Sequence, residues 1–139
     1  MRGRAHLADA GKKISRMRPS GESIFVNGND VLAFEAGIGN QITMMRRVAG
    51  MLAGGLFNVP LIGNGIVAVT SHDQPLTLVL KRGGGPMFTD PKATVAWSGS
   101  VQPEIVTDIS FGTLIGCSSG ESIQMKFEGE GCVVVQPYE

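Results

Sequence analysis

The sequence predicts an all-β fold with little or no helix: a β-roll or sandwich of two duplicated halves. Three observations support this prediction. The chain contains an internal repeat, its apolar residues alternate with polar ones or form short runs, and 20 of its 139 residues are glycine. Glycine at about twice its ordinary share, without a collagen period, is typical of turns and bulges between short strands. A chain of this length suffices for one core, so we expect a single β domain, 1–139.

The repeat emerges when the sequence is compared with itself. Residues 25–42 align with residues 88–105 at an offset of 63, and residues 54–70 align with residues 120–136 at an offset of 66. In the second pair the G-x-G turns coincide, and so do the valines that follow them. A repeat of this length indicates one supersecondary unit that occurs twice.

The two copies span approximately residues 25–70 and 88–136. Before the first copy, the segment GRAHLAD (3–9) resembles the strand that follows a G-x-G turn. We therefore expect the N-terminus to begin inside a repeat, either because an N-terminal portion is missing or because a second chain supplies the missing strands. An uncovered strand near residues 4–8 would then be an edge available for pairing.

Short alternating or β-branched runs, each bounded by turn residues, define the predicted strands. In chain order these runs are 30–34, 56–61, 65–70, 76–80, 93–97, 122–127 and 131–136. The runs at 65–70 and 131–136 are almost continuously apolar, which is typical of central strands covered on both faces. We expect the strand at 76–80 to pair with the strand before it.

One segment, QITMMRRVAGMLAG (41–54), has a pattern compatible with a helix. Its counterpart in the second copy, residues 104–120, is rich in β-branched residues. Because equivalent segments of a repeat share a conformation, we expect both to be extended.

The charge of the chain is zero overall but is unevenly distributed. Residues 1–18 contain six basic residues and one acidic residue, a net charge of +5, and the remaining residues sum to −5. A basic arm can bind nucleic acid or a membrane surface, and a basic leader can be a transit peptide. We interpret the segment instead as an edge strand and turn with solvated charges.

The apolar runs and the cysteines of the sequence indicate the compartment of the protein and the redox state of its thiols. No apolar run approaches the roughly 18 residues of a membrane span, and the basic segment lacks the apolar stretch of a secretory signal. Cys117 and Cys132 lack C-x-x-C spacing, so we expect two reduced thiols. These features predict a cytoplasmic protein.

Two catalytic motifs occur in contexts that do not suit them. The segment GCSSG (116–120) matches G-x-S-x-G with Ser118 in the nucleophile position, but no histidine follows His72. The segment GNGIVA (63–68) matches a dinucleotide-binding pattern, but a β-branched strand follows it instead of a helix. We expect no catalytic residue and no cofactor.

A metal site is also not expected. A β-roll metal site of the cupin type needs at least two histidines and a carboxylate inside the barrel. The chain contains only His6 and His72, and we expect the latter in a solvated turn.

Two groups of side chains are candidates for structural or binding roles. Trp97 and its repeat counterpart Phe34 are expected in the core, because equivalent aromatic residues in two copies are typical of packing. The methionines of residues 44–51 are either core residues or part of an apolar surface, and two arginines beside them suit an interface. The candidate interface residues are Arg4, His6, Met44, Met45, Arg46, Arg47 and Met51.

Three patterns in the second half of the chain carry a family resemblance: D-P-x-x-x-V-A-W, S-G-E-S and F-x-G-x-G-x-V-x-V-Q-P. With VNGNDVLAFEA and AGMLAGGLFNV of the first half, they resemble the altered-inheritance-of-mitochondria protein twenty-four family, over nearly the whole chain. The resemblance implies a fold like that of the trp RNA-binding attenuation protein, a double-stranded β-helix or β-roll of duplicated halves. It also implies that the chain matches the C-terminal portion of longer members, and it supplies no catalytic residue. The match to a bacterial-type pattern favours a bacterial cytoplasmic protein, or a mitochondrial one only if the source is eukaryotic.

These observations predict a non-enzymatic, homo-oligomeric β-roll protein, a trimer or a dimer, that acts as a scaffold or interaction protein. The alternative, by analogy with the fold, is a nucleic-acid or small-ligand binding module, although fold alone does not transmit function. Nucleic acid is the less favoured partner because the body of the chain is acidic. An enzyme of unrecognised type and a peripheral role at a membrane surface remain further alternatives.

Overall fold

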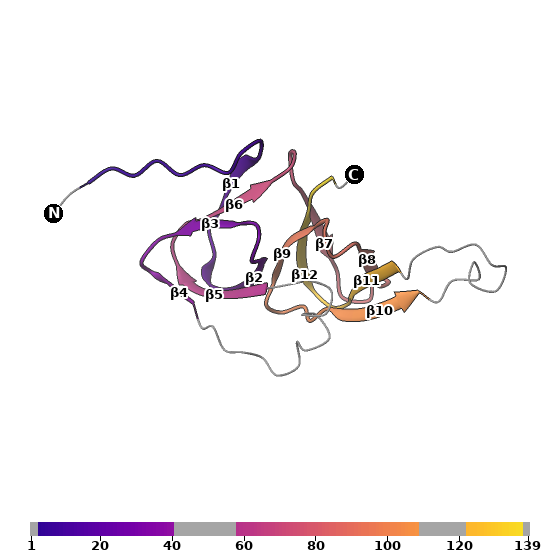
Figure 1. The fold of residues 1–139 in the computed structure, drawn as a ribbon. Helices are drawn as coiled ribbons and strands as arrows, with labels where there is room; N and C mark the ends of the chain where they lie inside the picture. The colour runs from indigo at the N-terminus through magenta and orange to yellow at the C-terminus, as the bar shows by residue number, and fades with distance from the viewer. Residues whose placement is uncertain (1–2, 41–57, 109–121, 138–139) are drawn as a thin grey trace.

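A computed structural model describes residues 3–40, 58–108 and 122–137 of the chain (Figure 1). The described residues form twelve strands and no helix, which confirms the all-β prediction. The first six strands are β1 (Lys13–Met17), β2 (Ser20–Asn27), β3 (Val31–Phe34), β4 (Ile38–Asn40), β5 (Asn58–Asn64) and β6 (Val67–Ser71). The next six are β7 (Leu76–Leu80), β8 (Met87–Thr89), β9 (Thr94–Ser98), β10 (Glu104–Asp108), β11 (Ser122–Phe127) and β12 (Gly131–Val135).

The same strand pairings occur in each half of the chain. In the first half β6 lies between β1 and β3, and β5 lies between β4 and β2. In the second half β12 lies between β7 and β9, and β11 lies between β10 and β8. All of these pairs are antiparallel. Each strand of the first half thus has a counterpart six positions later with equivalent neighbours.

The turns before β3 and β9 are held by equivalent hydrogen bonds. The Asn27 Oδ1 atom accepts from the backbone N–H of Asn29 at 3.1 Å, and the Asp90 Oδ1 atom accepts from the N–H of Lys92 at 2.8 Å. Side chains of Asn and Asp stabilise turns in this way. Asn27 and Asp90 are 63 residues apart, which is the offset of the sequence alignment.

A further antiparallel pairing joins the two halves. Strand β2 of the first half lies beside β9 of the second half, so that six strands form one sheet in the order β4-β5-β2-β9-β12-β7. We call the β2–β9 pairing the internal junction. It lies near the middle of the molecule in Figure 1.

Two apolar cores lie on opposite faces of the six-stranded sheet. Neighbouring residues of a strand point to opposite faces, and Ala96 and Trp97 of β9 belong to different cores. Ala96 packs with Val67 and Val69 of β6, whereas Trp97 packs with Phe127 of β11. The three-stranded sheet β1-β6-β3 therefore covers one face, and β10-β11-β8 covers the other.

Most of the predicted strands are confirmed. The runs at 76–80 and 122–127 coincide with β7 and β11, and the buried positions Val67, Val69 and Val133 are each at most 1% exposed. Val135, near the end of its strand, is only partly buried.

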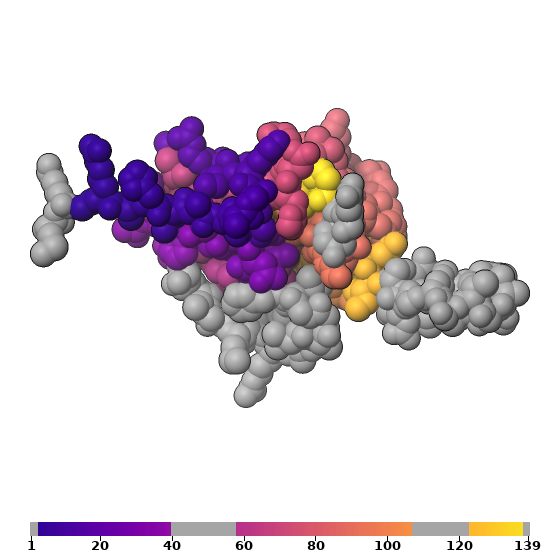
Figure 2. Space-filling model, turned by 45° about the horizontal axis from the view of Figure 1, so that its top comes forward, coloured from indigo at the N-terminus to yellow at the C-terminus, as the bar shows by residue number. Residues whose placement is uncertain are grey.

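Three other expectations are wrong. Residues 4–8 form no strand; they are exposed and extend away from the body of strands in Figure 2, and the edge strand of this region is β1. Strand β7 pairs with β12 rather than with β6, because β1 and β3 already occupy both sides of β6. Phe34 is 39% exposed rather than in the core, because β3 lies at the edge of its sheet.

Two expectations lie outside the described residues. The proposed extended conformation of residues 41–54 cannot be compared, and neither can that of residues 109–120. The first part of the latter segment, β10, is extended as expected.

In the described part of the chain there is no helix of the length and apolarity needed to cross a membrane.

Candidate functional site

The internal junction places one strand of each half side by side. In its register Ile24 lies opposite Ser98, Phe25 opposite Trp97 and Val26 opposite Ala96. These pairs alternate between the two faces of the sheet, so the junction contributes side chains to both cores.

An aromatic cluster fills one face of this junction. The rings of Phe25 and Trp97 are stacked, with centroids 5.6 Å apart and planes 10° apart. Phe127 of β11 contacts the Trp97 ring edge-on at 5.7 Å. Trp97 is only 3% exposed, and its indole Nε1 has no hydrogen-bond acceptor among the described residues. The core position predicted for Trp97 is confirmed.

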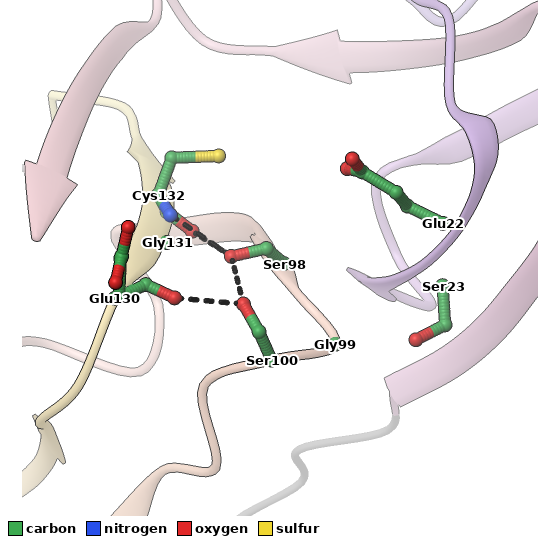
Figure 3. Close-up of a pocket in the computed structure, with 8 residues that line it drawn as sticks. All are labelled: Glu22, Ser23, Ser98, Gly99, Ser100, Glu130, Gly131 and Cys132. Atoms are coloured by element: carbon green, nitrogen blue, oxygen red, sulfur yellow. Dashed lines mark hydrogen bonds between the residues drawn. The ribbon is translucent and has the colours of Figure 1, made fainter.

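Beside the cluster, the junction opens into a hollow of about 480 Å³ (Figure 3). Figure 3 shows Glu22 of β2 on one side of the hollow and Cys132 of β12 on the other, with the Cys132 sulfur directed toward the glutamate. The residues that line the hollow are Glu22, Ser23, Ser98, Gly99, Ser100, Glu130, Gly131 and Cys132. The hollow thus combines two carboxylates, three hydroxyls and one thiol.

The hydroxyl groups of Ser98, at the end of β9, and of Ser100, in the turn after it, form hydrogen bonds with the backbone around the start of β12. The Ser98 Oγ atom accepts a hydrogen bond from the Cys132 N–H at 2.9 Å, and the Ser100 hydroxyl donates to the Glu130 carbonyl oxygen at 2.8 Å. The turn itself is tied to β2, because the Gly99 N–H donates to the Ser23 carbonyl oxygen at 2.7 Å. The hydroxyls therefore hold two backbones together.

The first half contains a counterpart of this serine contact. The Glu35 Oε2 atom accepts from the Ile66 N–H at 2.7 Å. Glu35 and Ser98 are 63 residues apart, and Ile66 and Cys132 are 66 residues apart, as in the sequence alignment. A side-chain oxygen thus caps the same backbone N–H in each half.

Two glycines allow the close approach of backbones around the hollow. A Cβ atom on Gly99 would lie 1.8 Å from the Ser23 Oγ atom and 2.8 Å from the Ser23 carbonyl oxygen. A Cβ atom on Gly131 would lie 2.2 Å from the Ser98 Oγ atom and 2.6 Å from a methyl group of Val101. All four separations are below van der Waals contact, so any side chain at either glycine would displace its neighbours.

No histidine is among the residues that line the hollow, and the Ser98 and Ser100 hydroxyl groups already form hydrogen bonds with backbone groups. Among the described residues there is also no group of three or more His, Cys, Asp and Glu side chains placed to hold a metal ion. Cys132 carries a free thiol, whereas Cys117 lies outside the described residues.

A second polar cluster surrounds Asp30, which is 3% exposed at the start of β3. The Lys12 ammonium lies 3.5 Å from the Asp30 carboxylate and 3.1 Å from that of Asp9. The Thr70 hydroxyl donates to Asp9 at 3.4 Å. The cluster attaches the turn before β1 to β3 and β6.

Burial and charge act in opposite directions on the pKa values of this cluster. Burial raises the pKa of Asp30, and the nearby Lys12 charge only partly offsets this. The hydrogen bond with Lys12 lowers the pKa of Asp9. Burial lowers the pKa of Lys12, but the hydrogen bond with Asp9 and the charge of Asp30 outweigh it, so that the pKa lies above its usual value. The pattern is that of an ion-pair network that joins strands.

The candidate residues from the sequence lie apart from the hollow. Arg4 and His6 are exposed in the segment before β1 and contribute to neither polar cluster. Met44, Met45, Arg46, Arg47 and Met51 lie outside the described residues, as does Ser118. His72 is exposed in the turn between β6 and β7, as expected. No helix follows the G-x-G turn at 63–65.

Sequence reasoning did not single out the residues of the hollow. A signal was nevertheless present, because the repeat alignment places Glu35 on Ser98, two polar residues at the end of matching strands. What the alignment could not show is that β2 and β9 lie side by side.

Comparison with known proteins agrees with the fold and the motifs. A family model described as Mitochondrial biogenesis AIM24 matches residues 3–138. The chain belongs to this family, which confirms the resemblance seen in its sequence patterns. No curated protein matches the chain.

The fold is also found in a solved structure. A structural-genomics crystal structure of a Streptococcus pyogenes protein is similar, with a TM-score of 0.68 and 23% sequence identity. The match covers 91% of this chain and 55% of that protein, so the chain spans about half of its length. At this identity the similarity concerns the fold.

Proposed function

We propose that the chain is a non-enzymatic, homo-oligomeric β-roll protein that serves as a scaffold or interaction module. The observation that carries the proposal is the placement of its exposed apolar side chains. Among the described residues, Leu7, Ile14, Phe34, Ile62, Leu76, Val79, Phe88 and Ile123 are large, apolar and exposed. Five of these eight lie on β1, β3, β7 or β8, which are edge strands of their sheets.

Edge strands with apolar side chains favour association. Such a strand presents unpaired N–H and C=O groups together with apolar surface, and natural proteins normally protect it with charge or cover it. Strands β8 and β3 are examples, because neither carries a charged residue and Phe88 and Phe34 are 50% and 39% exposed. Pairing with a second copy would cover surface of this kind.

The matched pairings of the two halves support a duplicated unit as the origin of this architecture. A unit that joins its own copy within one chain is suited to joining further copies in the same way. The cytoplasmic location and the identity of a protein partner stay predictions from the sequence.

The oligomeric state tests this proposal. Size-exclusion chromatography with light scattering, at micromolar concentration, is expected to give a mass two or three times the 14.6 kDa of one chain. A monomer under these conditions would contradict it.

A second candidate function, small-ligand binding, is favoured by the hollow at the internal junction. Its two carboxylates, Glu22 and Glu130, suit a small polar cation such as a polyamine. Spermidine should then raise the melting temperature of the protein and have less effect on Glu22→Gln. Equal effects on the two proteins would exclude the hollow as the site.

A further inference from the structure

The internal junction has equivalents at two free edges of the molecule. At the repeat offset of 63, β2 corresponds to β8 and β9 corresponds to β3. Within the described residues β8 pairs only with β11, and β3 pairs only with β6. Each strand therefore retains one edge that its counterpart uses in the junction. The two edges lie on opposite sides of the molecule in Figure 1.

The aromatic residues of these edges are exposed where their counterparts are packed. Trp97 is 3% exposed, whereas its counterpart Phe34 on β3 is 39% exposed. Phe25 is partly buried in the stack on Trp97, whereas its counterpart Phe88 on β8 is 50% exposed. Phe34 on one edge and Phe88 on the other are thus the counterparts of the two stacked rings, and both are exposed.

The small residue next to Phe34 shows the same difference. Ala96 is fully buried at the internal junction, whereas its counterpart Ala33 is only partly buried. The difference in exposure therefore extends along β3 rather than being confined to one ring, as expected for a strand without its neighbour.

We propose that the β8 edge of one copy pairs with the β3 edge of a second copy, so that the contact between copies repeats the internal junction. This inference rests on the proposed homo-oligomer and names its interface. By the register of the junction, Phe88 lies opposite Phe34 of the second copy, and Thr89 lies opposite Ala33 of the second copy. The two phenylalanines then form the stack that Phe25 and Trp97 form within one chain.

The charges near the two edges are compatible with this pairing. Residues 83–89 contain no charged side chain. The register places Met87 opposite Glu35 of the second copy, and the Glu35 carboxylate already accepts a hydrogen bond from the Ile66 N–H. The contact therefore brings no like charges together and leaves the Glu35 oxygen with its partner.

The contact uses different surfaces on its two sides. A contact of this type builds either a closed ring or an open filament. The trimer or dimer expected from the sequence corresponds to a ring in which internal junctions alternate with junctions between copies.

A charge exchange tests the pairing through the mass of the particle. Phe34→Glu and Phe88→Lys are each expected to reduce the mass to that of one chain, because each removes one ring of the stack and leaves a desolvated charge without an opposite charge in the contact. The protein that carries both substitutions is expected to regain the parent mass, because each glutamate then meets a lysine. Val79→Lys changes a 65% exposed residue of another edge strand, β7; it is the matched control and should leave the mass unchanged.

Disulfide formation tests which edges meet. In a background of Cys117→Ser and Cys132→Ser, chains with Phe34→Cys and chains with Phe88→Cys are co-expressed with different tags and oxidised. A cross-linked dimer is expected in the mixture and in neither protein alone, and Val79→Cys combined with Phe88→Cys should give none.

The outcomes separate this inference from the proposed function. If the parent is oligomeric, and the single charge variants keep its mass, the pairing is wrong while the oligomer stands. Variants that lose the oligomer singly, do not regain it together, and give no mixed cross-link would also overturn the pairing. A monomeric parent contradicts both.

Discussion

Substitutions of Val69 are the sharpest test of the core that the sheet β1-β6-β3 covers. It lies on β6 between Ser15 of β1 and Val31 of β3, and it is 1% exposed. Val69→Ala removes two buried methyl groups at about 0.8 kcal/mol each, and the cavity adds roughly 1 kcal/mol. The expected loss is therefore about 2–3 kcal/mol, or a decrease of about 7–10 °C in melting temperature for a domain of this size.

Two further variants, a control at an exposed valine and a charged substitution at Val69, set the expected loss of stability in context. Val79→Ala changes an edge-strand valine that is 65% exposed, and should alter the melting temperature by less than about 2 °C. Val69→Asp places an unpaired carboxylate in the core at a cost of several kcal/mol more, which approaches the whole stability of a typical domain. Equal melting temperatures of Val69→Ala and Val79→Ala in a thermal denaturation experiment would show that residue 69 faces water.

Three further predictions concern the polar sites. Gly131→Ala should lower the melting temperature by several degrees, because its Cβ would lie 2.2 Å from the Ser98 Oγ atom; an unchanged melting curve would contradict the close approach. Burial raises the pKa of Asp30, so the folded state holds this proton more tightly than the unfolded state does. The Asp30→Asn variant should therefore be more stable than the parent at pH 7. The difference in stability should shrink as the pH falls through the raised pKa toward the usual pKa of aspartate, about 4. A difference that grows as the pH falls would contradict the raised pKa of Asp30. His72→Ala and Ser118→Ala should leave folding and any activity unchanged, and a hydrolase screen in which Ser118→Ala abolishes an activity of the parent would overturn that reading.

The sequence predicted the strands well wherever local pattern determines them. Strands β7 and β11 coincide with the predicted runs because their bounds follow from turn residues and short apolar runs. The predicted strand at 4–8 failed because a resemblance to another segment does not supply a pairing partner, and these residues have none among the described ones.

What the sequence could not give was the neighbour of each strand. Trp97 and Phe34 occupy equivalent positions of the repeat, yet only Trp97 has β2 beside it within the same chain. The pairing of β7 with β12 has the same cause, because two other strands already occupy both sides of β6. The hollow at the internal junction was unforeseen for this reason, since its lining comes from β2, the end of β9 with the turn after it, and β12 with the turn before it.

The mass of the intact assembly tests the central claim, a homo-oligomer, most directly. Native mass spectrometry of the unmodified chain, at micromolar concentration and low ionic strength, is expected to show one dominant species of two or three copies of the 14.6 kDa chain. A spectrum that contains only the single chain at every concentration tested would contradict the account.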